Sequence, residues 1–377
     1  MVAGGRYLSG DEPVRMFAIS ADAVNRSIEV AWPSGGRSFI SNPEPNHVYE
    51  VIEPSGDEPG DPLVKQEADH FFEDASRLLN HVHVENVYDD TALQPLIIRR
   101  LDRSGPGVAW FDYDGDGDED LLIGAGKGSA VAVYQNLGDG RFGKVTSASG
   151  VKVPGDVTGV SGWISGTGIR QWIAAVSNYE NPQQNAQMRS YRKSIGLAVN
   201  SKSLGDTMPG PIAVADVDRD GDLDVFIGGR AVTGHYPQAS VSSLLLATGR
   251  SLDQVESALS NSLGIVNGAV FSDLDADGFP ELIVATEWGP VRVFKNHEGH
   301  FDEMTDGLGL AGLTGLWQGV ATGDFDGDGL QDIVATNWGL NTSIRPNVLN
   351  PPRLYFNYSE SSVPTCLLYT SPSPRDA

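Results

Sequence analysis

The stretch GDFDGDGLQDIVATNWG, residues 323–339, places four carboxylates within ten residues and then runs directly into an apolar segment. The acids are Asp324, Asp326, Asp328 and Asp332, and Gly329 follows the third of them. Carboxylates this close repel one another or raise each other's pKa unless a cation neutralises them. We therefore expect the loop to be frayed at neutral pH without a bound ion.

The same pattern occurs three more times in the chain. The related stretches are WFDYDGDGDEDLLIGAG from residue 110, VADVDRDGDLDVFIGGR from 214 and FSDLDADGFPELIVATE from 271. The first gap, from Asp112 to Asp216, is about two periods wide, so a fifth unit is expected inside it. Residues 159–177, GVSGWISGTGIRQWIAAVS, have the flanking apolar runs but no aspartate in the loop. We expect this degenerate unit to hold no ion.

Short apolar runs surround each acidic loop and predict strands. In the opening stretch GVATGDFD leads into the loop and DIVATNW leads out, which makes the loop a hairpin connection. A third and a fourth short run follow in several units, such as PVRVFKNHEG and HFDEMT. Four strands in about 50 residues form a small antiparallel sheet that cannot bury both faces alone. Radial stacking of such sheets predicts an all-β fold, a β-propeller of four-stranded blades.

The spacing of the acids predicts calcium as the ion. Counting the first aspartate as position 1, carboxylates stand at positions 1, 3, 5 and 9, glycine stands at 6, and the carbonyl of position 7 adds an oxygen. Such an oxygen-only cage suits Ca²⁺, whereas Mg²⁺ keeps its waters. Asp and Gly also favour turns without any ion, but four copies with the same ligand positions favour the metal.

An EF-hand is excluded because it needs Glu at position 12 and a helix afterwards. Position 12 here is apolar and lies in a predicted strand: Ile123, Ile227, Val284 or Ala335. In the third loop Glu281 replaces the final aspartate and Pro280 precedes it, but the longer carboxylate can still reach the ion.

The pattern D-x-D-x-D-G-x-x-D between two strands resembles the FG-GAP/VCBS repeats of integrin-α-like β-propellers over about residues 100–360. The resemblance implies about four Ca²⁺ ions. Their ligands would be Asp112, Asp114, Asp116 and Asp120; Asp216, Asp218, Asp220 and Asp224; Asp273, Asp275, Asp277 and Glu281; and Asp324, Asp326, Asp328 and Asp332.

The first 55 residues differ from the repeats. The strand SIEVAW, the turn PSGG and the returning strand RSFIS predict a hairpin. The Gly-x-Tyr-x-Ser start, the Trp-Pro-Ser-Gly turn and Asn46, Tyr49 and Glu53 resemble the ASPIC/UnbV module over residues 4–53. In proteins of that kind the module follows a run of repeats. We therefore expect the chain to begin partway through a longer protein, with any signal peptide missing from it.

Composition shifts predict the domain organisation. Residues 1–55 form the small all-β module, and EPSGDEPGDP, residues 53–62, reads as a linker. Residues 56–100 would be linker and lead-in strands, and 101–361 an incomplete propeller. The segment 362–377 fits no repeat, carries the single cysteine, Cys366, and resembles translated adapter read-through, so we expect a non-native tail.

Two smaller groups of residues offer other sites. His81, His83 and Glu85 alternate and could bind a transition metal from one face of a strand, although polar decoration or a contact between blades is the favoured interpretation. Trp288 and Trp338 follow equivalent strands, and Trp317 precedes the fourth loop. Packing between blades is favoured for these tryptophans over a sugar-stacking platform.

The net charge of −24 argues against nucleic acid and anionic membranes as partners, and no apolar run approaches the roughly 20 residues of a membrane span. No nucleophile or phosphate-binding motif is present. We expect the chain not to be an enzyme. It would be a binding or adhesion module for a protein or carbohydrate ligand and part of a larger secreted or surface bacterial protein. Its oligomeric state is unknown. Calcium cages of this kind fill outside the cytosol, which predicts an extracellular, cell-surface or periplasmic location. The alternative is a carbohydrate-active enzyme or lyase built on a propeller.

Overall fold

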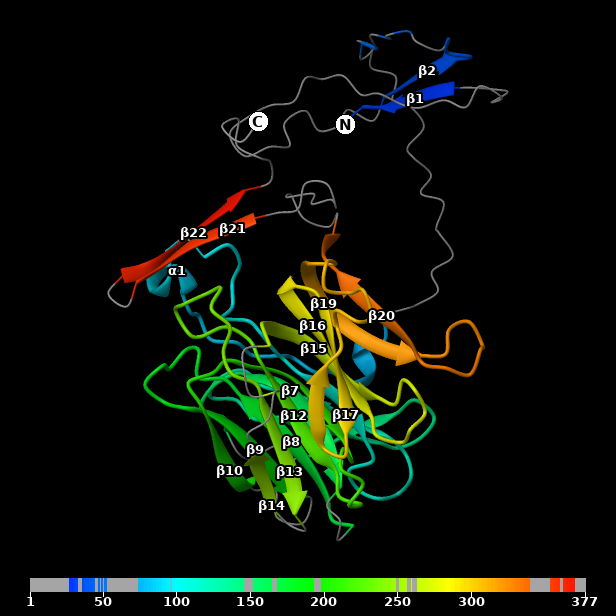
Figure 1. The fold of residues 1–377 in the computed structure, drawn as a ribbon. Coiled ribbons are helices and arrows are strands. Elements are labelled where there is room, and N and C mark those ends of the chain that lie inside the picture. The colour runs from blue at the N-terminus through cyan, green and yellow to red at the C-terminus, as the bar shows by residue number, and fades with distance from the viewer. Residues whose placement is uncertain are drawn as a thin grey trace. The chain divides into compact units, whose positions relative to one another are not determined.

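The computed structural model describes most of the chain, and it divides into two units, residues 1–75 and 76–377 (Figure 1). The described residues are 27–32, 36–44, 47, 49, 51–52, 74–95, 97–145, 152–164, 168–192, 198–248, 251–255, 259, 263–339, 353–359 and 362–369. The predicted linker within residues 53–62 lies outside them, and the domain boundaries stay a prediction.

The described part of the first unit contains a β-hairpin. Strands β1 (Ser27–Ala31) and β2 (Arg37–Ser41) pair antiparallel, from Ser27 opposite Ser41 to Ala31 opposite Arg37. A side-chain hydrogen bond also joins the two sides of the hairpin, because Trp32 Nε1 donates to Ser38 Oγ at 2.9 Å. The hairpin expected from SIEVAW and RSFIS is therefore present, while its turn residues 33–35 lie outside the described ones.

Three four-stranded antiparallel sheets begin the second unit, each with its strands in sequence order. The first contains β3 (Val108–Phe111), β4 (Asp120–Ile123), β5 (Ala132–Asn136) and β6 (Phe142–Lys144). The second contains β7 (Val157–Ile164), β8 (Arg170–Val176), β9 (Ala186–Arg192) and β10 (Ala198–Gly205). The third contains β11 (Pro209–Ala215), β12 (Asp224–Gly229), β13 (Ser243–Thr248) and β14 (Ser251–Val255).

A fourth sheet and part of a fifth follow. The fourth contains β15 (Ile265–Ser272), β16 (Glu281–Gly289), β17 (Val291–His297) and β18 (His300–Glu303). The next strands, β19 (Gly315–Gly323) and β20 (Asp332–Asn337), join it through pairing of β19 with the end of β16. The expected degenerate unit thus occupies a full sheet, β7 to β10, although its loop residues 165–167 lie outside the described part.

The remaining elements are short. Strands β21 (Arg353–Ser359) and β22 (Ser362–Tyr369) pair with each other, so residues 362–369 form a strand although their sequence fits no repeat. The helices are η1 (Ser76–Leu78) and α1 (Asp90–Leu93), and residues 81–89 between them form no strand. No helix in the described part of the chain is long and apolar enough to cross a membrane.

The sheets stack side by side as blades of a β-propeller. Their first strands contact one another in succession, β3 with β7, β7 with β11, β11 with β15 and β15 with β19. The core lies between neighbouring blades: Leu122 of the first blade shares a cluster with Trp172 of the second, and Phe226 of the third with Phe294 of the fourth. The all-β propeller architecture predicted from the repeats is confirmed.

Glycines allow the first strands to approach closely. A Cβ added at Gly107 would lie 2.8 Å from the Cα of Gly159 in the next blade, and one added at Gly268 would lie 2.8 Å from the Cα of Gly319. Both distances are shorter than real Cβ contacts, and the obstructing atoms are backbone atoms that cannot rotate away. Part of the high glycine content is therefore needed for packing around the propeller axis.

We expect Gly268→Ala to lower the free energy of unfolding by about 1–3 kcal/mol, because the methyl group would push β15 away from β19. Gly312→Ala is the matched control, since a Cβ there meets nothing within 4 Å. Chemical denaturation of the two variants measures the difference. Equal stability of both would mean that the blades separate without cost at this point.

Candidate metal centres

Each acidic loop connects the first strand of a blade to the second. The loops join β3 to β4, β11 to β12, β15 to β16 and β19 to β20. Position 6 needs glycine in all four because φ there is left-handed: 97° at Gly117, 92° at Gly221, 90° at Gly278 and 90° at Gly329. In every loop the N–H of this glycine donates to the position-1 carboxylate, for example Gly221 to Asp216 Oδ2 at 3.0 Å.

The position-9 carboxylate ties the loop to the blade. Asp224 accepts the N–H of Val217 at 2.9 Å within the loop and the N–H of Ala247 on the third strand at 2.8 Å. Its side chain is fully buried, and this burial raises its pKa to about 6, although both hydrogen bonds act to lower it. Asp120 makes the same two contacts, to Tyr113 N at 3.0 Å and Asn136 N at 2.8 Å.

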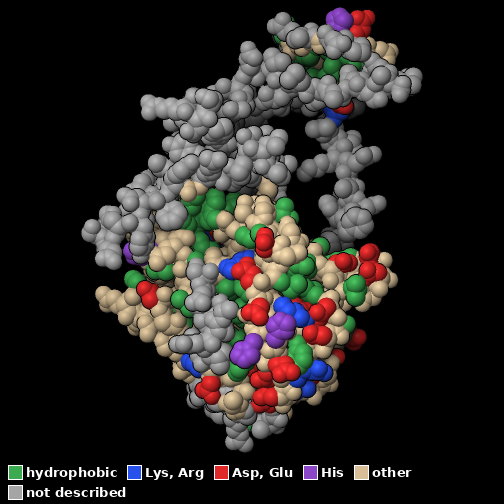
Figure 2. Space-filling view, viewed as in Figure 1, with side chains coloured by type: hydrophobic (Ala, Val, Ile, Leu, Met, Phe, Trp, Pro, Cys, Tyr) green, Lys and Arg blue, Asp and Glu red, His purple; other side chains and the backbone are tan. Residues whose placement is uncertain are grey.

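The structure brings three of the four predicted ligands together in each loop. Positions 1, 3 and 9 each offer an oxygen atom, and these atoms lie within 4.8 Å of one another. The sets are Asp112, Asp114 and Asp120; Asp216, Asp218 and Asp224; Asp273, Asp275 and Glu281; and Asp324, Asp326 and Asp332. Figure 2 shows acidic side chains at several separate places on the face that it draws.

The position-5 acids are not part of these sets. Each accepts the N–H of the residue two positions further along the loop. Asp116, for example, accepts from Asp118 N at 3.0 Å. The four residues are Asp116, Asp220, Asp277 and Asp328, and the spacing alone did not reveal this turn-forming contact. Their role as ligands stays a prediction.

The donor sets of the first, second and fourth loops fit a hard cation, since they consist of carboxylate oxygens. In the second loop Asp216 Oδ1 is buried and has no hydrogen-bond partner among the described residues, so an ion there would satisfy it. In the first loop Gln135 Nε2 donates to Asp114 Oδ2 at 2.5 Å. Arg170, the first residue of β8 in the degenerate unit, forms an ion pair with the first loop, with its Nη1 3.4 Å from Asp112 Oδ2.

The third loop differs because a lysine lies among its acids. Lys295 Nζ is 2.6 Å from Asp275 Oδ2, 2.6 Å from Asp277 Oδ2 and 3.0 Å from Glu281 Oε1. Desolvation acts to lower the pKa of Lys295, but its contacts with the three carboxylates outweigh it and raise that pKa above its ordinary value. The hydrogen bond from Lys295 in turn lowers the pKa of Asp277. This donor set does not fit a metal ion while the ammonium is in place.

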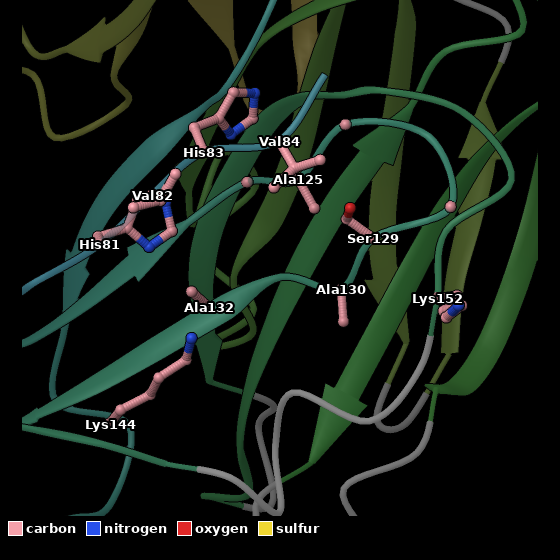
Figure 3. A pocket seen from close by; sticks show the side chains of 13 residues that line it. His81, Val82, His83, Val84, Ala125, Ser129, Ala130, Ala132, Lys144 and Lys152 are labelled. Atoms are coloured by element: carbon pink, nitrogen blue, oxygen red, sulfur yellow. The ribbon is translucent and has the colours of Figure 1, made fainter. Parts of the chain in front are cut away.

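His81, His83 and Glu85, for which a transition-metal site was the less favoured interpretation, do not converge on one point. His83 Nε2 lies 2.5 Å from Glu85 Oε1, whereas His81 Nδ1 lies 3.0 Å from Tyr134 OH. No cluster of metal-binding side chains in the described part of the chain contains both histidines. They lie instead in a pocket of about 400 Å³ beside the first blade, whose ionisable lining is entirely basic (Figure 3). Lys144 points toward His81, and burial together with this positive charge lowers the pKa of His81.

The tryptophans take part in packing and hydrogen bonding. Trp288 Nε1 donates to Tyr236 OH at 2.7 Å, and Tyr236 donates to the buried Glu287. Arg99 pairs with Glu287 at 2.6 Å, and its Cζ lies 5.4 Å from the ring centroid of Trp338. Trp317 packs in the cluster between β16 and β20. Packing between blades, the favoured interpretation, fits Trp288 and Trp317, whereas Trp338 is 37% exposed.

We expect Asp224→Ala to lower the free energy of unfolding by about 2–4 kcal/mol even in EDTA, because two buried N–H groups lose their acceptor. Asp218→Ala removes a carboxylate of the same loop that accepts one N–H bond at 3.2 Å, so its cost in EDTA is smaller. Denaturant unfolding of both variants compares them. Equal costs would show that position 9 has no structural role apart from an ion.

Comparison with protein-family models finds an FG-GAP-like repeat at residues 104–165 and again at 273–335, and an ASPIC and UnbV domain at residues 1–58. The first match extends into the degenerate unit. A search of curated proteins finds no match.

Similar solved structures include BBS1N in complex with ARL6DN, soaked with lead. It is 13% identical, has a TM-score of 0.32, and the match covers 62% of this chain and 76% of that one. A second is an Agrocybe aegerita lectin described as recognising non-reducing terminal N-acetylglucosamine. It is 17% identical, has a TM-score of 0.34, and the match covers 63% of this chain and 61% of the lectin. From the family matches and the blades, the chain is a propeller-type all-β protein that contains FG-GAP-like repeats and an ASPIC and UnbV domain.

Proposed function

We propose that the chain is a calcium-stabilised binding module, and that its ligand is a protein or a carbohydrate. The observation that carries the proposal is the convergence of carboxylates from positions 1, 3 and 9 in each acidic loop. Three carboxylates whose oxygens lie within 4.8 Å destabilise a hairpin unless a cation balances their charge. The proposal concerns the first, second and fourth loops, because the Lys295 ammonium lies among the acids of the third loop.

When bound, Ca²⁺ supplies a positive charge and up to eight oxygen coordination positions at each loop. The residues of this chain shape the loop and hold the carboxylates in position. Position 6 turns the loop and its N–H fixes the position-1 carboxylate, while in the first and third blades the position-9 acid anchors the cluster to the third strand. The ion would therefore fix the turn between the first two strands of a blade.

The propeller-type fold and the charge pattern support binding rather than catalysis as the activity. Surfaces between blades and loops are suited to protein or carbohydrate ligands, and the proposal includes no catalytic residue. Calcium cages of this kind fill at micromolar to millimolar calcium, so we place the protein outside the cytosol, in the medium, at the cell surface or in the periplasm.

Removing calcium should lower the melting temperature strongly. If each filled loop has calcium at ten to a hundred times its Kd, mass action contributes about 1.4–2.7 kcal/mol per site. EDTA removes this contribution, and calcium should restore it better than magnesium does. Thermal melts in EDTA, calcium and magnesium test the proposal, and identical melts in all three would contradict it.

Replacing one ligand should remove one ion. Asp326→Ala deletes the position-3 carboxylate of the fourth loop, so we expect the calcium content to fall by one and the remaining acids to loosen the hairpin. Asp306→Ala, an exposed acid outside the loops, is the matched control. Elemental analysis of dialysed protein counts the ions. An unchanged count in the Asp326→Ala protein would show that this loop is only a turn.

A glycan array and a turnover assay on the same polysaccharides separate binding from catalysis. We expect retention on the array or on a protein partner in the presence of calcium, without product formation. Release of new reducing ends or unsaturated products would contradict the binding proposal and support the enzyme alternative.

A further inference from the structure

The strand register identifies equivalent residues beside three of the acidic loops. Position 10 of the loop pairs with Tyr134 in the first blade, with Leu245 in the third and with Phe294 in the fourth. The next residue along the third strand therefore lies beside the position-9 acid. These neighbours are Gln135, Leu246 and Lys295.

The chemistry of this neighbour differs from blade to blade. Gln135 brings a neutral amide, which bonds Asp114, and Leu246 brings no polar group. Lys295 brings a positive charge to the equivalent place in the third loop. Of the three neighbours, Lys295 alone can balance carboxylate charge without an ion from solution.

The contacts of Lys295 are those expected of a bound cation. Its Nζ reaches two acids of the predicted ligand pattern at 2.6 Å, Asp275 and Asp277, and the position-9 acid Glu281 at 3.0 Å. The Glu281 side chain is 1% exposed and that of Lys295 18% exposed, so the contact is shielded from water. The contacts with Asp275 and Asp277 are charge-assisted hydrogen bonds, which are the stronger kind, and they and the ion pair with Glu281 would be lost if the lysine were expelled.

Glu281 adapts the loop to this arrangement. Its Oε2 accepts the N–H of Leu274 at 2.7 Å, which is the same loop contact that the position-9 aspartates make in the other blades. Its Oε1 is left to face Lys295. In the first and third blades the second oxygen of the position-9 acid accepts a third-strand N–H instead. The longer side chain and the lysine thus occur together.

We propose that Lys295 is a tethered cation that takes the place of the metal in the third loop. The third loop, which belongs to the fourth blade, then stays ordered without calcium. The first, second and fourth loops depend on the ion. The inference rests on the proposed function for those three loops and departs from the expectation of about four ions. The wild-type protein should bind three.

Hydrogen exchange in EDTA tests the tethered cation without any metal. We expect amides of residues 273–281 to exchange at least about tenfold more slowly than those of the first and second loops, and Lys295→Gln to remove this protection. Lys152→Gln, at an exposed lysine, is the control. Exchange of the third loop as fast as that of the others, or protection that survives Lys295→Gln, would overturn the inference.

Calcium stoichiometry by calorimetry gives the reciprocal test. Lys295→Gln, which copies the first blade, should raise the count from three ions to four, and Gln135→Lys, which copies the fourth blade, should lower it to two. Four ions in the wild type would overturn the inference and leave the proposed function standing. No calcium in any variant would sink the proposed function, and the exchange experiment in EDTA would still decide the role of Lys295.

Discussion

The repulsion between carboxylates in the hairpin loops is the constraint on which the rest of the structure depends. Apart from the degenerate second blade, each blade begins with a strand, an acidic loop and a second strand, and the loop gathers three acids within 4.8 Å. The position-9 acid is also a structural acceptor: in the first and third blades it holds an N–H of the loop and an N–H of the third strand. The position-9 carboxylate therefore stabilises the hairpin through its hydrogen bonds, while its negative charge beside the other acids destabilises the same hairpin. Whatever cation balances that charge also stabilises the blade.

Blades depend on one another through close packing. Apolar side chains of neighbouring sheets share clusters, and glycines let the first strands approach near the axis. A loop that loses its cation would loosen the hairpin whose second strand supplies the core, such as Leu122 or Phe226. Ion binding therefore stabilises the core packing of its own blade. Because neighbouring blades share apolar clusters, it also stabilises the packing of the next blade. In the fourth blade, Lys295 would keep the acidic loop ordered at any calcium concentration.

The repeat pattern predicted the blades, their strand order and the degenerate unit because period-two hydrophobicity and turn residues are local signals. It also predicted the clustering of positions 1, 3 and 9. It missed the turn contacts of position 5, since a carboxylate can bind an ion or its own backbone at the same spacing. Lys295 and Arg170 were missed for another reason: their contacts with the loops depend on strand register and on the neighbouring blade. The signal for Lys295 was its place immediately before Asn296, which corresponds to Gln135 before Asn136.

An anomalous difference map from crystals of the full chain grown in calcium would locate the ions directly. The account predicts peaks inside the loops that begin at Asp112, Asp216 and Asp324, each bounded by the carboxylates of positions 1, 3 and 9. It predicts the Lys295 ammonium, without a peak, among Asp275, Asp277 and Glu281. Loops that are ordered in calcium but contain no anomalous peak at any of the first three positions would contradict the central claim that these acids are held together by a metal ion.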